Sequence, residues 1–167
     1  MKKKIVEVLE HIVGKIPSKI KWVVFGSSNM LLQGVKLNTD PDDVDILTDN
    51  AGLSNFLKMF NKNKDLKRNY KGVDGKNYFQ EIKLKINDIE ISIMTEEILK
   101  PDKRIFDEGF RSKYITNNKI PLMNLRKQLL GMKRIYDSRG DKPDNPGGRK
   151  LKIELLEKYL NLNTNYK

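Results

Sequence analysis

From residue 22 the sequence reads Trp22-Val-Val-Phe-Gly-Ser-Ser-Asn-Met-Leu-Leu-Gln-Gly34, and from residue 42 it reads Asp42-Asp-Val-Asp-Ile-Leu47. The first stretch opens with four apolar residues in a row, which is typical of a strand buried on both faces. Gly26 and two serines follow, and then an apolar run, so we expect a strand, a tight turn and a short helix with a serine at its start. In the second stretch apolar residues alternate with Asp43 and Asp45, which predicts another strand.

The two aspartates carry the first chemical signal. Residues i and i+2 of a strand point to the same face, so Asp43 and Asp45 would project together. Two carboxylates on one face repel each other unless a cation lies between them, and Mg²⁺ prefers oxygen ligands with few of them from protein. A third acid on a neighbouring strand would complete a two-metal site. Glu90, which lies between Ile89 and Ile91, is the best candidate.

The turn after the first strand carries the second signal. A glycine at position 26 would let a ligand approach the backbone closely. The start of the following helix would offer free N–H groups to a phosphate, and the Ser27 hydroxyl could add a hydrogen bond. We therefore predict a phosphate-binding turn at Gly26 and Ser27.

Together these features resemble the nucleotidyltransferase superfamily, of the DNA-polymerase-β-like type. Its signature is an apolar strand, Gly-Ser, a spacer, Asp-x-Asp in a strand, and a later acid flanked by apolar residues. The matching positions are Gly26, Ser27, Asp43, Asp45 and Glu90. The resemblance covers roughly residues 20–95 and is closest to the small stand-alone members, the minimal and the antibiotic-modifying nucleotidyltransferases.

The resemblance implies an α/β (α+β) fold, in which helices flank a mixed β-sheet. It also implies an enzyme that moves a nucleoside monophosphate from a nucleoside triphosphate, by default ATP, to a hydroxyl acceptor, with release of pyrophosphate. Asp43 and Asp45 would hold Mg²⁺ or Mn²⁺, and Glu90 would either bind the catalytic metal or take the proton from the acceptor hydroxyl. Gly26 and Ser27 would bind the β- and γ-phosphates. The acceptor could be a small molecule, an RNA or a protein. Small relatives often pair, so a homodimer is a further expectation.

Two features keep other functions open. The spacer between Ser27 and Asp43 holds 15 residues, slightly long for the family, and Ser92 occupies a second position where relatives often carry an acid. If that second position is the one that matters, the chain would bind nucleotide or a partner protein without catalysis, as an antitoxin-like subunit might. A lesser alternative is a basic RNA-binding module, because the formal net charge is +11.

Composition excludes several other classes. The 167 residues contain no cysteine and one histidine, which excludes a disulfide framework, a thiolate metal site and a histidine-rich metal site. No apolar run approaches the length of a membrane span, and the N-terminus lacks the features of a signal peptide. We therefore expect a cytoplasmic protein with no membrane partner.

The remaining patterns predict one domain over residues 1–167. Its catalytic core would cover about 18–100, and a helical C-terminal part about 120–162. Within these limits the patterns predict the following elements: a helix over 2–15, a helical stripe over 53–60, a basic loop over 61–77, a hairpin over 79–94, and helices over 122–137 and 149–160.

Overall fold

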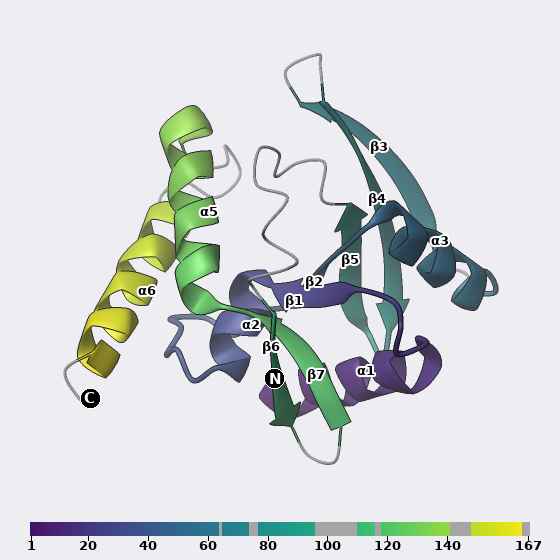
Figure 1. The fold of residues 1–167 in the computed structure, drawn as a ribbon, viewed down its shortest axis with the longest axis horizontal. Helices are drawn as coiled ribbons and strands as arrows, with labels where there is room; N and C mark the ends of the chain where they lie inside the picture. Colours follow the sequence, from purple (N-terminus) through teal and green to yellow (C-terminus); the bar gives the residue numbers. More distant parts are fainter. Residues whose placement is uncertain (64, 74–76, 96–109, 116–117, 141–147, 165–167) are drawn as a thin grey trace.

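The computed structural model describes residues 1–63, 65–73, 77–95, 110–115, 118–140 and 148–164. These residues contain five helices and seven strands (Figure 1). The helices are α1 (Lys2–Lys15), α2 (Gly26–Leu32), α3 (Asn50–Met59), α5 (Leu125–Arg139) and α6 (Gly148–Thr164). The strands are β1 (Trp22–Phe25), β2 (Asp43–Thr48), β3 (Lys67–Val73), β4 (Asn77–Ile86), β5 (Ile89–Thr95), β6 (Phe110–Ile115) and β7 (Asn118–Met123).

All seven strands form one mixed sheet in the order β3-β4-β5-β2-β1-β7-β6. Strand β2 pairs antiparallel with β1 and parallel with β5, and β1 pairs parallel with β7. Both edges of the sheet are antiparallel pairs, β3 with β4 and β6 with β7. The two motif-bearing strands therefore lie in the middle of the sheet, where neighbours on both sides hold them.

The hairpin of β4 and β5 fixes the register on one side of the site. Asn87 and Asp88 form its turn with φ angles of 50° and 63°. Two consecutive left-handed residues make the mirror-image turn that suits the twist of a two-residue hairpin, and Asn and Asp tolerate that conformation well. The predicted hairpin is confirmed.

One face of the sheet packs against α1 and α3 to form the main core. The strands contribute the apolar half of each alternation, for example Val44 and Ile46 of β2. Phe56 of α3 is fully buried there, and its ring lies edge-to-face with Trp22 at a centroid distance of 6.3 Å. Because Val44 and Ile46 face this core, the residues that alternate with them on β2 face the opposite side.

The C-terminal helices pack elsewhere. Helices α5 and α6 lie side by side, away from α1 and α3 (Figure 1). A separate apolar cluster joins them to α2 through Met30, Leu125 and Leu156. The Tyr159 hydroxyl of α6 also donates a hydrogen bond to the backbone oxygen of Gln33, 2.8 Å away. These contacts fasten the helical part to α2 and to the residue that follows it.

The fold class is confirmed, and so is the helix predicted over 2–15. The loop predicted over 61–77 is wrong, because β3 extends the sheet there by pairing with β4. A basic strand at a sheet edge lacks the apolar alternation by which strands are usually predicted, and edge strands commonly carry charge for this reason.

The start of the helical C-terminal part also differs from the prediction. Leu122 fits the helical spacing of the apolar residues that follow it, but it belongs to β7 and pairs with Val24 of β1. The helical part therefore begins at Leu125 rather than near residue 120.

Within the described residues, no helix has both the length and the apolar character needed to cross a membrane.

We expect Phe56→Ala to lower the free energy of unfolding by about 3–5 kcal/mol, because it empties a fully buried aromatic position. Urea denaturation followed by circular dichroism measures this loss. Leu130→Ala is the control, because Leu130 is 53 % exposed and its truncation should change stability by at most about 0.5 kcal/mol. Equal losses in the two variants would contradict the assignment of the core.

Candidate active site

The turn between β1 and α2 brings Gly26 against Asp45. Gly26 has a φ of +73°, a backbone angle that residues other than glycine rarely adopt. A Cβ atom built on it would lie 2.5 Å from Oδ2 of Asp45, closer than any real contact. Phe25 and Asp45 are partners in the register of β1 and β2, so the carboxylate lies beside the turn. The glycine is therefore required both for its backbone angle and for the space that the carboxylate occupies.

The serines at this turn do not cap the helix. Phe25 is the N-cap residue of α2, and its side chain makes no capping hydrogen bond, so the predicted serine cap is wrong. Ser28 is buried, and its hydroxyl donates a hydrogen bond to the backbone oxygen of Asp43 at a distance of 2.5 Å. This bond joins the start of α2 to β2. Ser27 is half-buried at the first turn of α2.

Asp43 and Asp45 share one face of β2, as predicted from their spacing. Both are half-buried, and both alternate with fully buried apolar residues that face the core. Their face of the sheet continues onto β5, because Asp43 pairs with Glu90 and Asp45 pairs with Ser92. The structure thus brings the two aspartates and Glu90 together on neighbouring strands.

Glu90, however, has a cationic partner. Lys83 of β4 donates from Nζ to Oε1 of Glu90 at 2.7 Å. This hydrogen bond raises the pKa of Lys83. Burial alone would lower this pKa, but the nearby negative charges of Glu81, Glu90 and Asp43 also raise it. The ammonium group therefore stays charged within the acidic face and neutralises part of it.

Glu81 of β4 was not predicted from the sequence. It is 4 % exposed, and Oε1 accepts a hydrogen bond of 2.5 Å from the hydroxyl of Ser92. Charged residues are seldom buried this completely unless they have a partner. Alternation with Ile82 could have indicated that Glu81 shares a face with Lys83, but its burial depends on the sheet register.

A second polar group missed from the sequence holds the turn in place. Gln128 of α5 is 3 % exposed, and its Nε2 donates to the backbone oxygen of Gly26 at 3.0 Å. Its Oε1 accepts from Nδ2 of Asn29 at 2.8 Å, and the same Nδ2 donates to the oxygen of Met123 at 3.0 Å. Buried side-chain amides with several satisfied hydrogen bonds fix geometry more strictly than apolar contacts do.

The donor set fits a hard divalent cation in part. Asp43 and Asp45 offer carboxylate oxygens on one face, and Mg²⁺ is commonly held by one or two carboxylates together with substrate phosphates. Among the described residues, no three histidine, aspartate or glutamate side chains converge on a point that could hold a metal ion. The two aspartates therefore suit a divalent cation. Glu90 is paired with Lys83 and does not complete a site of three carboxylates.

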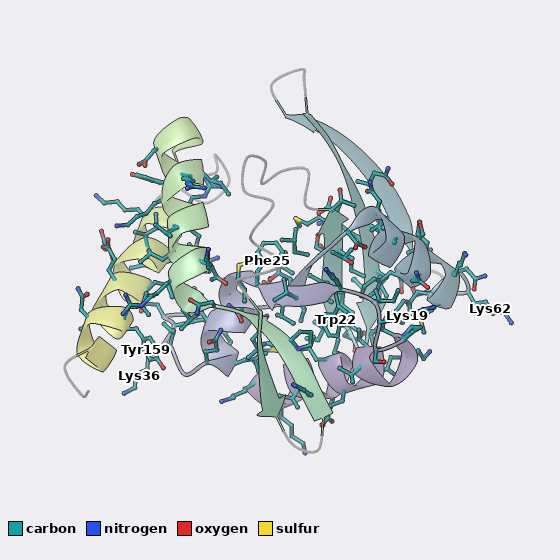
Figure 2. The ribbon with its side chains drawn as sticks, in the orientation of Figure 1. Lys19, Trp22, Phe25, Lys36, Lys62 and Tyr159 are labelled. Atoms are coloured by element: carbon teal, nitrogen blue, oxygen red, sulfur yellow. The ribbon has the colours of Figure 1, made fainter. Side chains whose placement is uncertain are left out.

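A cavity of about 290 Å³ opens beside Asp45. One wall comes from the sheet, including Phe25, which Figure 2 shows at the end of β1. The opposite wall comes from α5 and α6 and carries two cations, Arg149 and Lys152. The Arg149 guanidinium donates to the backbone oxygen of Gly140. The cavity thus has an acid, Asp45, on the sheet side and two cations on the helical side, and each wall also carries a methionine, Met94 of β5 and Met132 of α5.

We expect Gly26→Ala to destabilise the fold and to displace the Asp45 carboxylate. Gly34→Ala is the matched control: Gly34 also has a positive φ, of +93°, but an added Cβ there meets only an ordinary contact of 3.6 Å. The backbone cost alone is about 1–2 kcal/mol. Chemical denaturation should therefore show a larger loss for Gly26→Ala than for the control, and losses of equal size would show that the contact with Asp45 can relax freely.

Comparison with known proteins extends the likeness over nearly the whole chain. No family model matches the chain, and no curated protein matches its sequence. A solved protein from Thermotoga maritima, provisionally assigned as a nucleotidyltransferase, has a TM-score of 0.67 and 25 % identity. The match covers 95 % of this chain and 94 % of that one.

Two antibiotic-modifying proteins share the fold at lower identity. ANT(2")-Ia, solved with adenylyl-2"-tobramycin, has a TM-score of 0.61 and 10 % identity, over 95 % of this chain and 90 % of that one. The lincomycin-bound lincosamide antibiotic adenylyltransferase LnuA has a TM-score of 0.51 and 14 % identity, over 92 % of each chain. The likeness therefore includes the C-terminal helices as well as the motif-bearing strands, and the chain is a small protein of the nucleotidyltransferase fold.

Proposed function

We propose that the chain transfers a nucleoside monophosphate from a nucleoside triphosphate to a hydroxyl acceptor in a reaction that depends on Mg²⁺ or Mn²⁺. The observation that carries this proposal is the position of the Asp45 carboxylate against Gly26, with Asp43 on the same face. That arrangement supports the proposal, because two carboxylates that could hold a metal share a face beside a turn that a phosphate could approach closely. ATP is the proposed donor, because two proteins of the same fold are adenylyltransferases by name or by bound product.

Each group would have a defined part in the reaction. Asp43 and Asp45 would hold the divalent cation, which when bound would neutralise part of the negative charge on the phosphate oxygens. Gly26 and Ser27 would bind the β- and γ-phosphates, and Arg149 and Lys152 would face them across the cavity. The acceptor oxygen attacks the α-phosphorus, the bond from that phosphorus to the bridging oxygen of the β-phosphate breaks, and pyrophosphate leaves. In the same step the acceptor hydroxyl would pass its proton to solvent water.

A second candidate function is nucleotide binding without transfer. The pairing of Glu90 with Lys83 and the serine at position 92 favour it, because both reduce the number of carboxylates that face a metal. Release of pyrophosphate in the presence of a range of hydroxyl acceptors distinguishes the two functions, since only the transferase produces it.

We expect Asp45→Asn and Asp43→Asn each to weaken binding of Mg·ATP at least about tenfold, because each removes one charged metal ligand. Isothermal titration calorimetry measures this without knowledge of the acceptor. Asp42→Asn is the matched control: Asp42 is the exposed neighbour of Asp43, so this variant should bind as the wild type does. Undiminished binding by both site variants would refute the proposed site.

We expect Lys152→Ala to raise the Kd for ATP roughly fivefold, equivalent to about 1 kcal/mol for one charge-assisted contact with phosphate. Lys150→Ala removes the same charge from an exposed position that does not line the cavity. A rise of similar size in both variants would show general attraction by net charge rather than a contact within the cavity, and raising the salt concentration would then abolish it.

A further inference from the structure

The proposed reaction gives no part to Glu81, although this carboxylate is buried, with 4 % of the residue exposed. Its register partner on β5 is Met94, and Lys83, two residues on, faces Ser92. Glu81 therefore lies on the same face of the sheet as Asp43 and Asp45, at the end where the cavity opens beside Met94. A negative charge held so far from water is stabilised by a cation or by hydrogen bonds.

Ser92 lies on β5, between the strands that carry Glu81 and Asp45. Ser92 is 4 % exposed and is the register partner of Asp45 on one side. Its hydroxyl donates its single proton to Glu81 at 2.5 Å. A hydroxyl oxygen that gives its proton to a carboxylate keeps its lone pairs and gains electron density, so it becomes a better ligand for a cation.

Glu90 is placed differently. It pairs in register with Asp43, its side chain is 43 % exposed, and its charge is neutralised by Lys83. The Ser92–Glu81 pair is instead buried and lies beside Asp45, the aspartate that contacts the phosphate-binding turn. Of the two positions, the buried one has the lower local polarity, where a negative charge acts more strongly on a bound cation.

We propose that Ser92 and Glu81 together serve as the third acidic group of the site: Ser92 supplies an oxygen beside Asp45, and Glu81 supplies the charge through the hydroxyl hydrogen. This inference rests on the proposed metal-dependent function. Glu81 acts through Ser92 and is thus a positioning residue. In the assignment made from sequence alone, Glu90 held this part. The structure assigns it to two residues on adjacent strands.

The experiment is a titration with Mn²⁺ in the presence of α,β-methylene ATP, which cannot release pyrophosphate. Free Mn²⁺ is measured by electron paramagnetic resonance, so no turnover is needed. We expect Glu81→Gln and Ser92→Ala each to weaken Mn²⁺ binding about 10- to 100-fold, the range found for groups that support metal ligands. The exchange variant Glu81→Gln with Ser92→Asp should recover most of the affinity, because it returns one carboxylate to the position beside Asp45.

Glu7→Gln is the charge-matched control, because Glu7 is exposed on α1, which covers the opposite face of the sheet. Near-ultraviolet circular dichroism checks that each variant is folded. If Glu81→Gln does not fold, Ser92→Ala still tests the proposal, since it keeps the carboxylate and removes only the linking oxygen.

Wild-type affinity in both Glu81→Gln and Ser92→Ala would overturn the proposal. So would a loss in Glu90→Gln larger than in either of them. In both cases binding that still depends on Asp45 would leave the proposed function intact. If the wild-type protein itself bound no Mn²⁺, the proposed function would fail first and the role of the Ser92–Glu81 pair with it.

Discussion

The close approach of the Asp45 carboxylate to the backbone of Gly26 is the constraint on which the rest of the site depends. It requires a residue without a side chain at position 26, in a conformation that glycine adopts at low cost. It also requires β1 and β2 to be adjacent and in register, so that Phe25 pairs with Asp45. The sheet order satisfies this, because β1 and β2 lie at its centre with partners on both outer sides.

The C-terminal helices belong to the same unit, although their sequence carries no motif. Gln128 of α5 bonds to the oxygen of Gly26 and to Asn29, so a buried amide from one end of the chain holds the turn at the other. The same helices form the basic wall of the cavity. A displacement of α5 would therefore alter the turn as well as the cavity, and substrate contacts on the helical side can affect the carboxylate side through Gln128.

Sequence patterns were sufficient for the centre of the fold and for the pair of aspartates. The apolar run before Gly26 and the alternation around Asp43 and Asp45 are local signals, and the hairpin turn at Asn87 and Asp88 is another. Glu81 and Gln128 could not be found in this way, because their burial depends on which strands and helices become neighbours. The basic strand β3 was missed for a related reason: an edge strand is stabilised by pairing with β4 and needs no apolar alternation.

The balance of charge across the site explains why its acids are distributed over three strands. Asp43, Asp45, Glu81 and Glu90 on one face would repel each other strongly if all were free. Lys83 lies among them and compensates Glu90 directly, while Ser92 satisfies Glu81 by a hydrogen bond. Asp43 and Asp45 are the pair to which the proposed reaction assigns a divalent cation. The Lys83 ammonium thus lowers the repulsion among these acids, and Asp45 is the one of the four that lines the cavity.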